Sequence, residues 1–328
     1  MDKFKLTDVW NETIERNDKG IEPRSRVYAS EIGGAMIDRY LKMKGEAYTN
    51  PPNSRSMRKF MAGDIWEWIV QTVLVRAGIK YRTQEKVLVE YEGLLPISGR
   101  LDFIIHGGSD EIASGLSHDN TMPPFMQKLT EAITNTFAGK NFEETILEIK
   151  SVGSFVFESL LANDNPKTNH MLQACVYKKA TGLPASVIYV CRDDVRILQY
   201  SVDTIYEDLE QMVIEDLKEI TKYHNEDIEP EKEKLILLDK ISQKFTKNWK
   251  VSYSAYLTKL YSREVDGKEV PFSEPQEYDD YIAPIVSGAN RVLKRIKEGK
   301  ELTKSNEEWI EKMKLFDYNL LEIGKVMV

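Results

Sequence analysis

Cysteine and histidine are both scarce in this sequence. Its 328 residues include four histidines and two cysteines, Cys175 and Cys191. A disulfide scaffold is therefore not expected, and a four-cysteine zinc or iron–sulfur site within the chain is impossible. No stretch reaches the ~18 consecutive apolar residues of a membrane helix. The charged start, Met1-Asp2-Lys3-Phe4-Lys5, has no apolar stretch behind it that would mark a signal peptide. We therefore predict a cytoplasmic protein without a membrane partner.

An excess of positive charge is also missing. The chain has 45 Lys and Arg against 53 Asp and Glu, a net charge of −8. A protein that coats nucleic acid needs broad neutralisation of phosphates, so the composition argues against that class. An enzyme with a local basic groove and an acidic metal site stays open, because metal-binding carboxylates themselves lower the net charge. Apolar residues make up 41% and charged residues 30%, which excludes a wholly disordered chain.

The pattern of apolar residues predicts an α/β chain. Helical spacing from Met57 to Ala77 predicts a long helix, and Ser30 is expected to cap a helix that reaches Leu41. Further helices are expected at 154–163, 167–181 and 203–224. Short runs rich in β-branched residues predict strands at 86–91, 95–105, 145–150, 185–191 and 195–202. This order predicts a mixed core, a small sheet flanked by helices.

Two segments lie outside that core. The first is an insertion from 106 to 141, longer than ordinary strand connections, with a helix expected over Pro124–Phe137. The second follows Glu229 and is charged and helix-rich, with a hairpin turn at Asp266-Gly267 and helices near 279–297 and 304–322. We predict a core domain over residues 1–228, which contains the insertion, and a helix-rich C-terminal lobe over residues 229–328.

Glu148-Ile149-Lys150 ends an apolar, strand-like run. Alternate residues of a strand share a face, so Glu148 and Lys150 point the same way and Ile149 points into the core. A carboxylate beside an ammonium suits metal-assisted hydrolysis, in which the carboxylate holds a divalent cation and the lysine orients the attacking water. A surface ion pair at a solvated strand end is the structural alternative.

Two further carboxylates stand in apolar surroundings. Asp102 follows Gly99-Arg100-Leu101 inside an apolar strand, where burial is costly unless the group is paired or metal-bound. Glu67 lies between Trp66 and Trp68 on the predicted long helix. Neighbouring strands that carry Asp102 and Glu148 can bring two carboxylates to one Mg²⁺, which prefers oxygen ligands. The alternatives are an aspartate at a strand terminus and pairing of Glu67 with an arginine.

The helix predicted over 167–181 has a polar edge. Gln173 and Tyr177 lie four residues apart and face the same way, with His170 one turn upstream. The rest of this stretch is mostly apolar. The polar edge is therefore either a solvated helix face or part of a site.

Taken in order, these segments resemble the PD-(D/E)xK nuclease superfamily, specifically its RecB/Cas4-like branch, which includes phage exonucleases. The resemblance covers roughly Val27 to Val202 and predicts a restriction-endonuclease-like α/β core. Its elements are Tyr28-Ala29-Ser30-Glu31-Ile32, Gly63-Asp64-Ile65-Trp66-Glu67, Gly99-Arg100-Leu101-Asp102, Glu148-Ile149-Lys150-Ser151, and His170 with Gln173 and Tyr177.

The resemblance implies a role for each matching residue. Asp102, Glu148 and the carbonyl of Ile149 look like ligands of Mg²⁺ or Mn²⁺, and Lys150 looks like the catalytic lysine. Glu67 takes the helix position where many relatives place a histidine ligand. Gln173 and Tyr177 match the motif that organises the site and contacts DNA. Relatives with an iron–sulfur cluster use four cysteines, so this chain resembles the phage-type members without one.

DNA binding requires a local basic surface. The predicted DNA-binding residues are Arg55, Arg58, Lys59, His170, Gln173, Tyr177 and Lys178. In the C-terminal lobe, Lys244, Lys247, Lys250, Arg291, Lys294 and Arg295 could extend that surface. Trp249, Tyr253 and Tyr256 could stack on bases, or they belong to the core. Solvated helix faces are the alternative for all the basic runs.

These observations predict a Mg²⁺-dependent deoxyribonuclease, an exonuclease that hydrolyses phosphodiester bonds at DNA ends or in single strands. Two alternatives stay open. One is a catalytically inactive nuclease-fold subunit for DNA binding or assembly, and the other is an acidic scaffold with protein partners. The expected partners are DNA and a recombination or replication protein, in the host cytoplasm if a phage encodes the chain.

Overall fold

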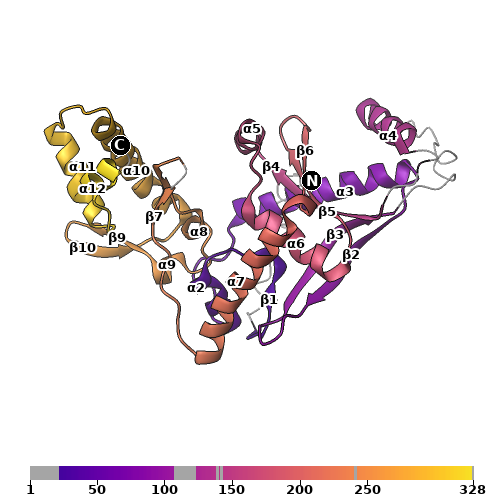
Figure 1. Cartoon of the computed structure of the whole chain (residues 1–328), viewed down its shortest axis with the longest axis horizontal. Coiled ribbons are helices and arrows are strands. Elements are labelled where there is room, and N and C mark those ends of the chain that lie inside the picture. Colours follow the sequence, from indigo (N-terminus) through magenta and orange to yellow (C-terminus); the bar gives the residue numbers. More distant parts are fainter. Residues whose placement is uncertain (1–21, 107–122, 138–139, 141–142, 240–241, 327–328) are drawn as a thin grey trace, which may run out of the picture. The chain divides into compact units, whose positions relative to one another are not determined.

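The structure is a computed structural model that describes residues 22–106, 123–137, 140, 143–239 and 242–326 (Figure 1). The described chain divides into two compact units. Unit 1 consists of residues 23–33 and 53–227, and unit 2 consists of residues 34–52 and 228–326 together with Glu22. The sequence-based division at residue 228 stays a prediction about independent domains. No helix of the described chain is long and apolar enough to cross a membrane.

Unit 1 is built on a six-stranded mixed sheet. Its strands are β1 (Val27–Tyr28), β2 (Tyr81–Val89), β3 (Ile97–Ile105), β4 (Thr145–Val152), β5 (Ala185–Cys191) and β6 (Ile197–Ser201). β2 pairs with one edge of β3, and β4, β5 and β6 follow in order from the other edge. β4 and β5 are parallel, whereas β2–β3, β3–β4 and β5–β6 are antiparallel. The predicted fold class, a small mixed sheet flanked by helices, is confirmed.

β3 and β4 pair over only three residues. Their register joins Phe103 to Leu147 and Ile105 to Thr145 and stops there. On the same edge of β3, the short β1 pairs with Ile97 and Ser98, because β2 already occupies the opposite edge. Residues 99–102 therefore have no strand partner on this edge. We call residues 99–102 of β3 together with 148–150 of β4 the fork.

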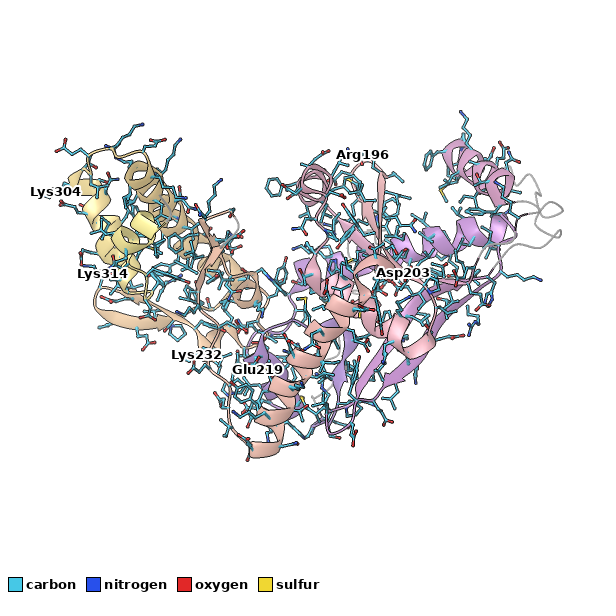
Figure 2. All side chains as sticks on the ribbon, viewed as in Figure 1. Arg196, Asp203, Glu219, Lys232, Lys304 and Lys314 are labelled. Atoms are coloured by element: carbon cyan, nitrogen blue, oxygen red, sulfur yellow. The ribbon has the colours of Figure 1, made fainter. Side chains whose placement is uncertain are left out.

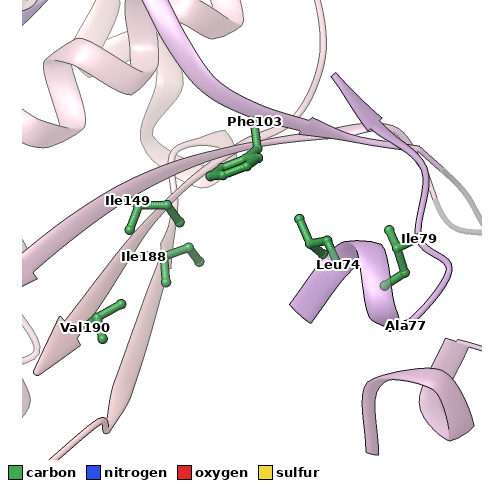
Figure 3. Packing of buried hydrophobic residues seen from close by; sticks show 7 residues of the cluster. All are labelled: Leu74, Ala77, Ile79, Phe103, Ile149, Ile188 and Val190. Carbon is green, nitrogen blue, oxygen red and sulfur yellow. The ribbon is translucent and has the colours of Figure 1, made fainter. Parts of the chain in front are cut away.

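Helices cover both faces of this sheet. They are η1 (Ala29–Glu31), α3 (Ser54–Arg76), α4 (Pro124–Phe137), α5 (Ser154–Asn163), α6 (Thr168–Thr181), η3 (Asp203–Ile205) and α7 (Tyr206–Glu226). The end of α3 packs on one face, where Leu74 and the C-cap Ala77 join a buried cluster with strand residues, shown in Figure 3: Leu74, Ala77, Ile79, Phe103, Ile149, Ile188 and Val190. α6 packs against β4 and β5 and is covered by α7. Side chains that alternate with Ile149 and Ile188 therefore face α6.

The helix predicted from Ser30 does not begin there. Residues 29–31 form a single 3₁₀ turn, and α2 (Met36–Met43) begins only at Met36. Gly33 has φ of 73°, a left-handed conformation that favours glycine and ends the turn. The prediction was therefore wrong for residues 30–35, where the chain passes from unit 1 into unit 2.

The helix predicted within the insertion is confirmed as α4, with the same bounds. Its Ile133 and Phe137 pack against the buried cluster beneath α3. The strand ends that flank the insertion are joined by His106 Nδ1, which contacts the Glu144 carboxylate. Residues 107–122 of the insertion lie outside the described residues. The described part of the insertion therefore packs on the core.

Unit 2 combines helices with two small hairpins. Besides α2 it contains β7 (Ile236–Asp239), β8 (Lys244–Lys247), α8 (Trp249–Ser252), α9 (Leu257–Leu260), β9 (Ser262–Val265), β10 (Lys268–Pro271), α10 (Pro275–Lys297), α11 (Lys304–Lys314) and α12 (Leu320–Val326). The turn predicted at Asp266-Gly267 joins β9 to β10, and both residues have positive φ, as a tight hairpin turn requires. In Figure 2, Lys304 and Lys314 mark the two ends of α11. The helix predicted near 304–322 is thus two helices.

Buried polar contacts tie residues 34–52 to the rest of unit 2. The carboxylate of Asp38, which is 5% exposed, accepts hydrogen bonds from Ser254 Oγ and from the Ala255 N–H, both at 2.8 Å. Tyr256 donates its hydroxyl proton to the Glu46 carbonyl at 2.8 Å. Because unsatisfied buried polar groups are costly, each side of this contact depends on the other.

Candidate active site

Glu148 and Lys150 meet on one face of β4, as predicted. Glu148 is 1% exposed, and its Oε1 lies 2.5 Å from Lys150 Nζ. Ile149, between them, points to the opposite face and joins the cluster beneath α3. The Lys150 side chain is 23% exposed. The ammonium group is thus held by a buried carboxylate, and part of the lysine side chain is solvent-accessible.

Asp102 of β3 bridges the gap between the two strands by a hydrogen bond to β4. The Ile149 N–H, which has no partner on β3 because the two strands separate, donates to Asp102 Oδ2 at 2.8 Å. The N–H and C=O of one residue in a strand point to the same side. The Ile149 carbonyl therefore points into the fork as well. Two carboxylates and this carbonyl, three of the predicted ligand groups, converge there.

Burial changes the protonation of these groups. It raises the pKa of Glu148 to about 8, and the nearby Asp102 carboxylate adds to the effect while Lys150 opposes it. Burial also raises the pKa of Asp102, again against the opposing effect of Lys150. Burial alone would lower the pKa of Lys150, but the charges of Glu148 and Asp102 outweigh it and raise that pKa. The fork therefore favours an added positive charge.

The donor set of the fork fits a hard divalent cation. Glu148 Oε2 is buried and has no hydrogen-bond partner within the described residues. A buried carboxylate oxygen without a donor is costly, and a cation at that position would satisfy it. Oxygen ligands suit Mg²⁺ or Mn²⁺. In the part of the chain that the structure describes, no three His, Cys, Asp or Glu side chains are grouped as a metal site.

Glu67 lies beside the fork on α3. Its Oε2 accepts a hydrogen bond from Gln84 Nε2 at 3.3 Å. Burial raises the pKa of Glu67 to about 7, and the Asp102 and Asp64 carboxylates raise it further. The charge of Asp102 therefore affects the pKa of Glu67. Among the described residues, Glu67 does not form a three-carboxylate cluster with Asp102 and Glu148. Its role as a metal ligand stays a prediction.

Gln173 and Tyr177 of α6 form a chain of hydrogen bonds to the β3 part of the fork. Gln173 Nε2 donates to the Tyr177 hydroxyl at 2.9 Å, and Tyr177 donates to the Arg100 carbonyl at 3.1 Å. That carbonyl belongs to the stretch of β3 without a strand partner. Both side chains are buried. Their hydrogen bonds therefore hold β3 in place where no neighbouring strand does so. The spacing of four residues puts both side chains on the same face of α6.

Gly99 makes room for this support. A Cβ added at Gly99 would lie 2.6 Å from Cε1 of Tyr177 and 3.0 Å from Cβ of Ala29. Gly99→Ala should therefore displace the Tyr177 ring, destabilise the protein by roughly 1–3 kcal/mol and lower any hydrolytic activity. Thermal unfolding and hydrolysis rates measure both effects. In the control Gly63→Ala, a Cβ meets nothing within 4 Å, so neither quantity should fall. Unchanged stability of Gly99→Ala would contradict this account.

His170 is held as a neutral side chain. Its Nδ1 lies 3.0 Å from the hydroxyl of Tyr189, which also accepts the N–H of Lys167 at 3.0 Å. Burial, with the charges of Lys150 and Lys167, lowers the pKa of His170 to about 3. His170 therefore reaches a substrate only as a neutral hydrogen-bonding group. Its predicted contact with DNA would not be a salt bridge.

The predicted basic residues have different surroundings. Lys178 Nζ lies 2.7 Å from Oδ1 of Asp203, which Figure 2 labels. Arg58 and Lys59 are exposed on the first half of α3. Arg55 lies in the first turn of that helix. Contacts of these four residues with DNA stay predictions, and Lys178 would have to exchange a carboxylate partner for a phosphate.

Two neighbours of the candidate site residues were missed at the sequence level. Arg100 is exposed, and its charge lowers the pKa of both Asp102 and Glu67 against the effect of burial. The alternation rule that pairs Glu148 with Lys150 would have placed Arg100 on the same face as Asp102. Tyr189, which orients His170, carries no such signal, because it lies in a strand whose residues are all buried.

No family model matches this chain, and no curated protein matches it. Among solved structures it is similar to the crystal structure of SSO0001, with 15% identity over 65% of this chain and 86% of that one and a TM-score of 0.39. It is also similar to an alkaline exonuclease (LHK-Exo) from Laribacter hongkongensis, with 11% identity, coverage of 62% and 91%, and a TM-score of 0.33. For LHK-Exo in complex with dAMP, the identity is 12%, the coverage is 62% and 91%, and the TM-score is 0.38. Similarities this weak say nothing about activity, so the function has to be inferred from the site's own residues.

Proposed function

We propose that this chain is a metal-dependent DNA nuclease, an exonuclease of the RecB/Cas4-like type that cleaves at DNA ends or in single strands. The observation that supports it most is the fork. There, two buried carboxyl groups, an inward main-chain carbonyl and a partly exposed lysine converge where β3 and β4 separate. A purely structural ion pair would not need a second carboxyl group with a raised pKa or a buried carboxylate oxygen without a donor.

Each residue of the fork then has a chemical task. Asp102, Glu148 and the Ile149 carbonyl, with Glu67 nearby, would hold Mg²⁺ or Mn²⁺, which supplies Lewis-acid polarisation of the scissile phosphate and charge neutralisation at the leaving 3′-oxygen. Lys150, held by Glu148, positions the hydrolytic water. The Ile149 N–H fixes the Asp102 carboxylate. Tyr177 keeps β3 in place through the Arg100 carbonyl.

Cleavage of end-labelled linear DNA tests this proposal. The purified wild-type protein should degrade single-stranded or duplex DNA with Mg²⁺ and should not do so in EDTA. The Lys150→Ala variant, purified identically, should be inactive, which excludes a contaminating nuclease. Covalently closed circles should resist, because an exonuclease needs an end.

The alternative assignments predict other results in the same assay. An inactive nuclease-fold subunit would bind the DNA and leave it intact with every metal ion. An acidic scaffold would neither bind nor cleave it. Cleavage by Lys150→Ala at the wild-type rate would refute the proposed mechanism.

A further inference from the structure

Two aromatic side chains of unit 2 are exposed to solvent. Trp249 begins α8, and Tyr253 is the C-cap of the same helix. Trp249 is 45% exposed and Tyr253 is 74% exposed. The Tyr253 N–H donates to the Trp249 carbonyl at 3.1 Å, so the two residues are one helical turn apart and share a face. Tyr256, the third aromatic of this segment, is fully buried. Tyr256 thus belongs to the core, and the other two rings are left available.

The sequence segment that carries these rings is basic in an otherwise acidic chain, and three of its four lysines, Lys259 with Glu46 among them, form ion pairs with carboxylates of other segments. Residues 244–259 contain four lysines and no Asp or Glu, whereas the whole chain carries −8. Lys244 is exposed. Lys247 lies 2.5 Å from Asp279, and Lys250 lies 3.7 Å from Glu233. These lysine side chains are partly exposed, so their ion pairs contribute little stability. A phosphate can therefore take the place of either carboxylate.

We propose that Lys247, Trp249, Lys250 and Tyr253 of unit 2 form a surface that binds single-stranded nucleic acid; Asp279 Oδ1 contacts both Lys247 Nζ and Ser252 Oγ of α8, which places Lys247 beside the helix. The bases would stack on the two rings, and the lysines would contact the phosphates. Protein-binding surfaces are depleted in lysine at their centres, which disfavours a protein partner here. In a duplex the bases are already stacked on each other, so a single strand is the preferred ligand. This surface goes beyond the proposed function, because it contains no residue of the fork.

Fluorescence anisotropy with a labelled oligothymidine of about 20 nucleotides tests this surface. The full chain is used in EDTA, so that binding is measured without cleavage and independently of the nuclease proposal. The double variant Trp249→Leu/Tyr253→Leu keeps apolar side chains but removes both rings, and should bind at least about tenfold more weakly. The double variant Trp249→Phe/Tyr253→Phe keeps two rings and should stay within about threefold of wild type. Leu315→Ala, a change at another exposed apolar residue of unit 2 (72% exposed), should leave binding unchanged.

The outcomes separate clearly because all these positions are exposed and the variants should fold, which circular dichroism checks. Weaker binding in the leucine variant, with near wild-type binding in the phenylalanine variant, supports the surface. Equal affinity of the leucine variant and wild type overturns it. So does a wild-type chain that self-associates through these rings and binds no oligonucleotide. Binding without cleavage would leave this surface standing and refute only the nuclease proposal.

Discussion

Glu148→Gln should abolish DNA cleavage and at the same time stabilise the protein in EDTA. Glutamine keeps an oxygen for Lys150 but loses the charge needed to hold a cation, so we expect the rate to fall by about a thousandfold or more. The wild-type carboxyl group is 1% exposed and has its pKa raised to about 8. At pH 8 and above its ionisation opposes folding, and the neutral amide should raise the free energy of unfolding by roughly 1–3 kcal/mol.

Cleavage of labelled DNA and thermal unfolding in EDTA measure the two effects. Glu158→Gln is the matched control, because Glu158 lies in the same unit with a side chain that is 55% exposed. That variant should keep both the rate and the stability. Asp102→Asn should behave like Glu148→Gln, since burial raises the pKa of Asp102 too. A Glu148→Gln protein that still cleaves DNA would remove the fork from consideration as the active site.

Mg²⁺ should stabilise the wild-type protein far more at pH 8 than at pH 6. Without metal, burial raises the pKa of Glu148 to about 8 and that of Glu67 to about 7, from an ordinary 4.5. The folded protein therefore holds protons that the unfolded chain has lost. The stability from these groups is fully present below pH 4.5 and is lost as the pH rises through about 7 and 8. A cation that replaces the protons restores it, by about 3 kcal/mol at a metal concentration some hundredfold above Kd.

Melting temperatures at several pH values, with and without MgCl₂, check this expectation. The melting temperature should fall with rising pH in EDTA and should recover when Mg²⁺ or Mn²⁺ is added. Ca²⁺ should also stabilise the protein but should not support turnover. Glu148→Gln should respond weakly to all three ions. Activity that persists in EDTA and is lost with a zinc-selective chelator would contradict an all-oxygen site.

Most of the unit 1 fold could be predicted because its signals are local. The helix over Pro124–Phe137 and the strand over 185–191 were found with their observed bounds. Apolar spacing and the Gly182 cap carry those signals within a few residues. The prediction was wrong for residues 30–35, where Gly33 turns the chain into the other unit. That turn depends on contacts with distant residues, such as the Gly33 N–H donating to Asp216.

The residues of the candidate site could be predicted from the sequence, but their arrangement in space could be predicted only in part. Strand alternation alone places Glu148 and Lys150 together. The separation of β3 from β4 could not be predicted, because pairing partners far apart in sequence decide it. The same separation frees the Ile149 N–H for Asp102 and gives Tyr177 a carbonyl to bind. The exposure of Trp249 and Tyr253 was likewise undecidable from spacing, which fits core and surface positions equally.

Unit 2 is assembled from two segments far apart in the sequence, mainly residues 34–52 and 228–326, and this affects how the protein is made. Asp38 and Ser254, which meet in its interior, are 216 residues apart. During synthesis, residues 34–52 emerge long before any of their partners, so unit 2 can form only after most of the chain has left the ribosome. Such long-range pairing slows folding and leaves apolar surface uncovered for longer. In a nascent chain that stalls near residue 228, α2 would lack the residues it packs against in unit 2. We therefore expect chaperone binding to be greatest at this stage.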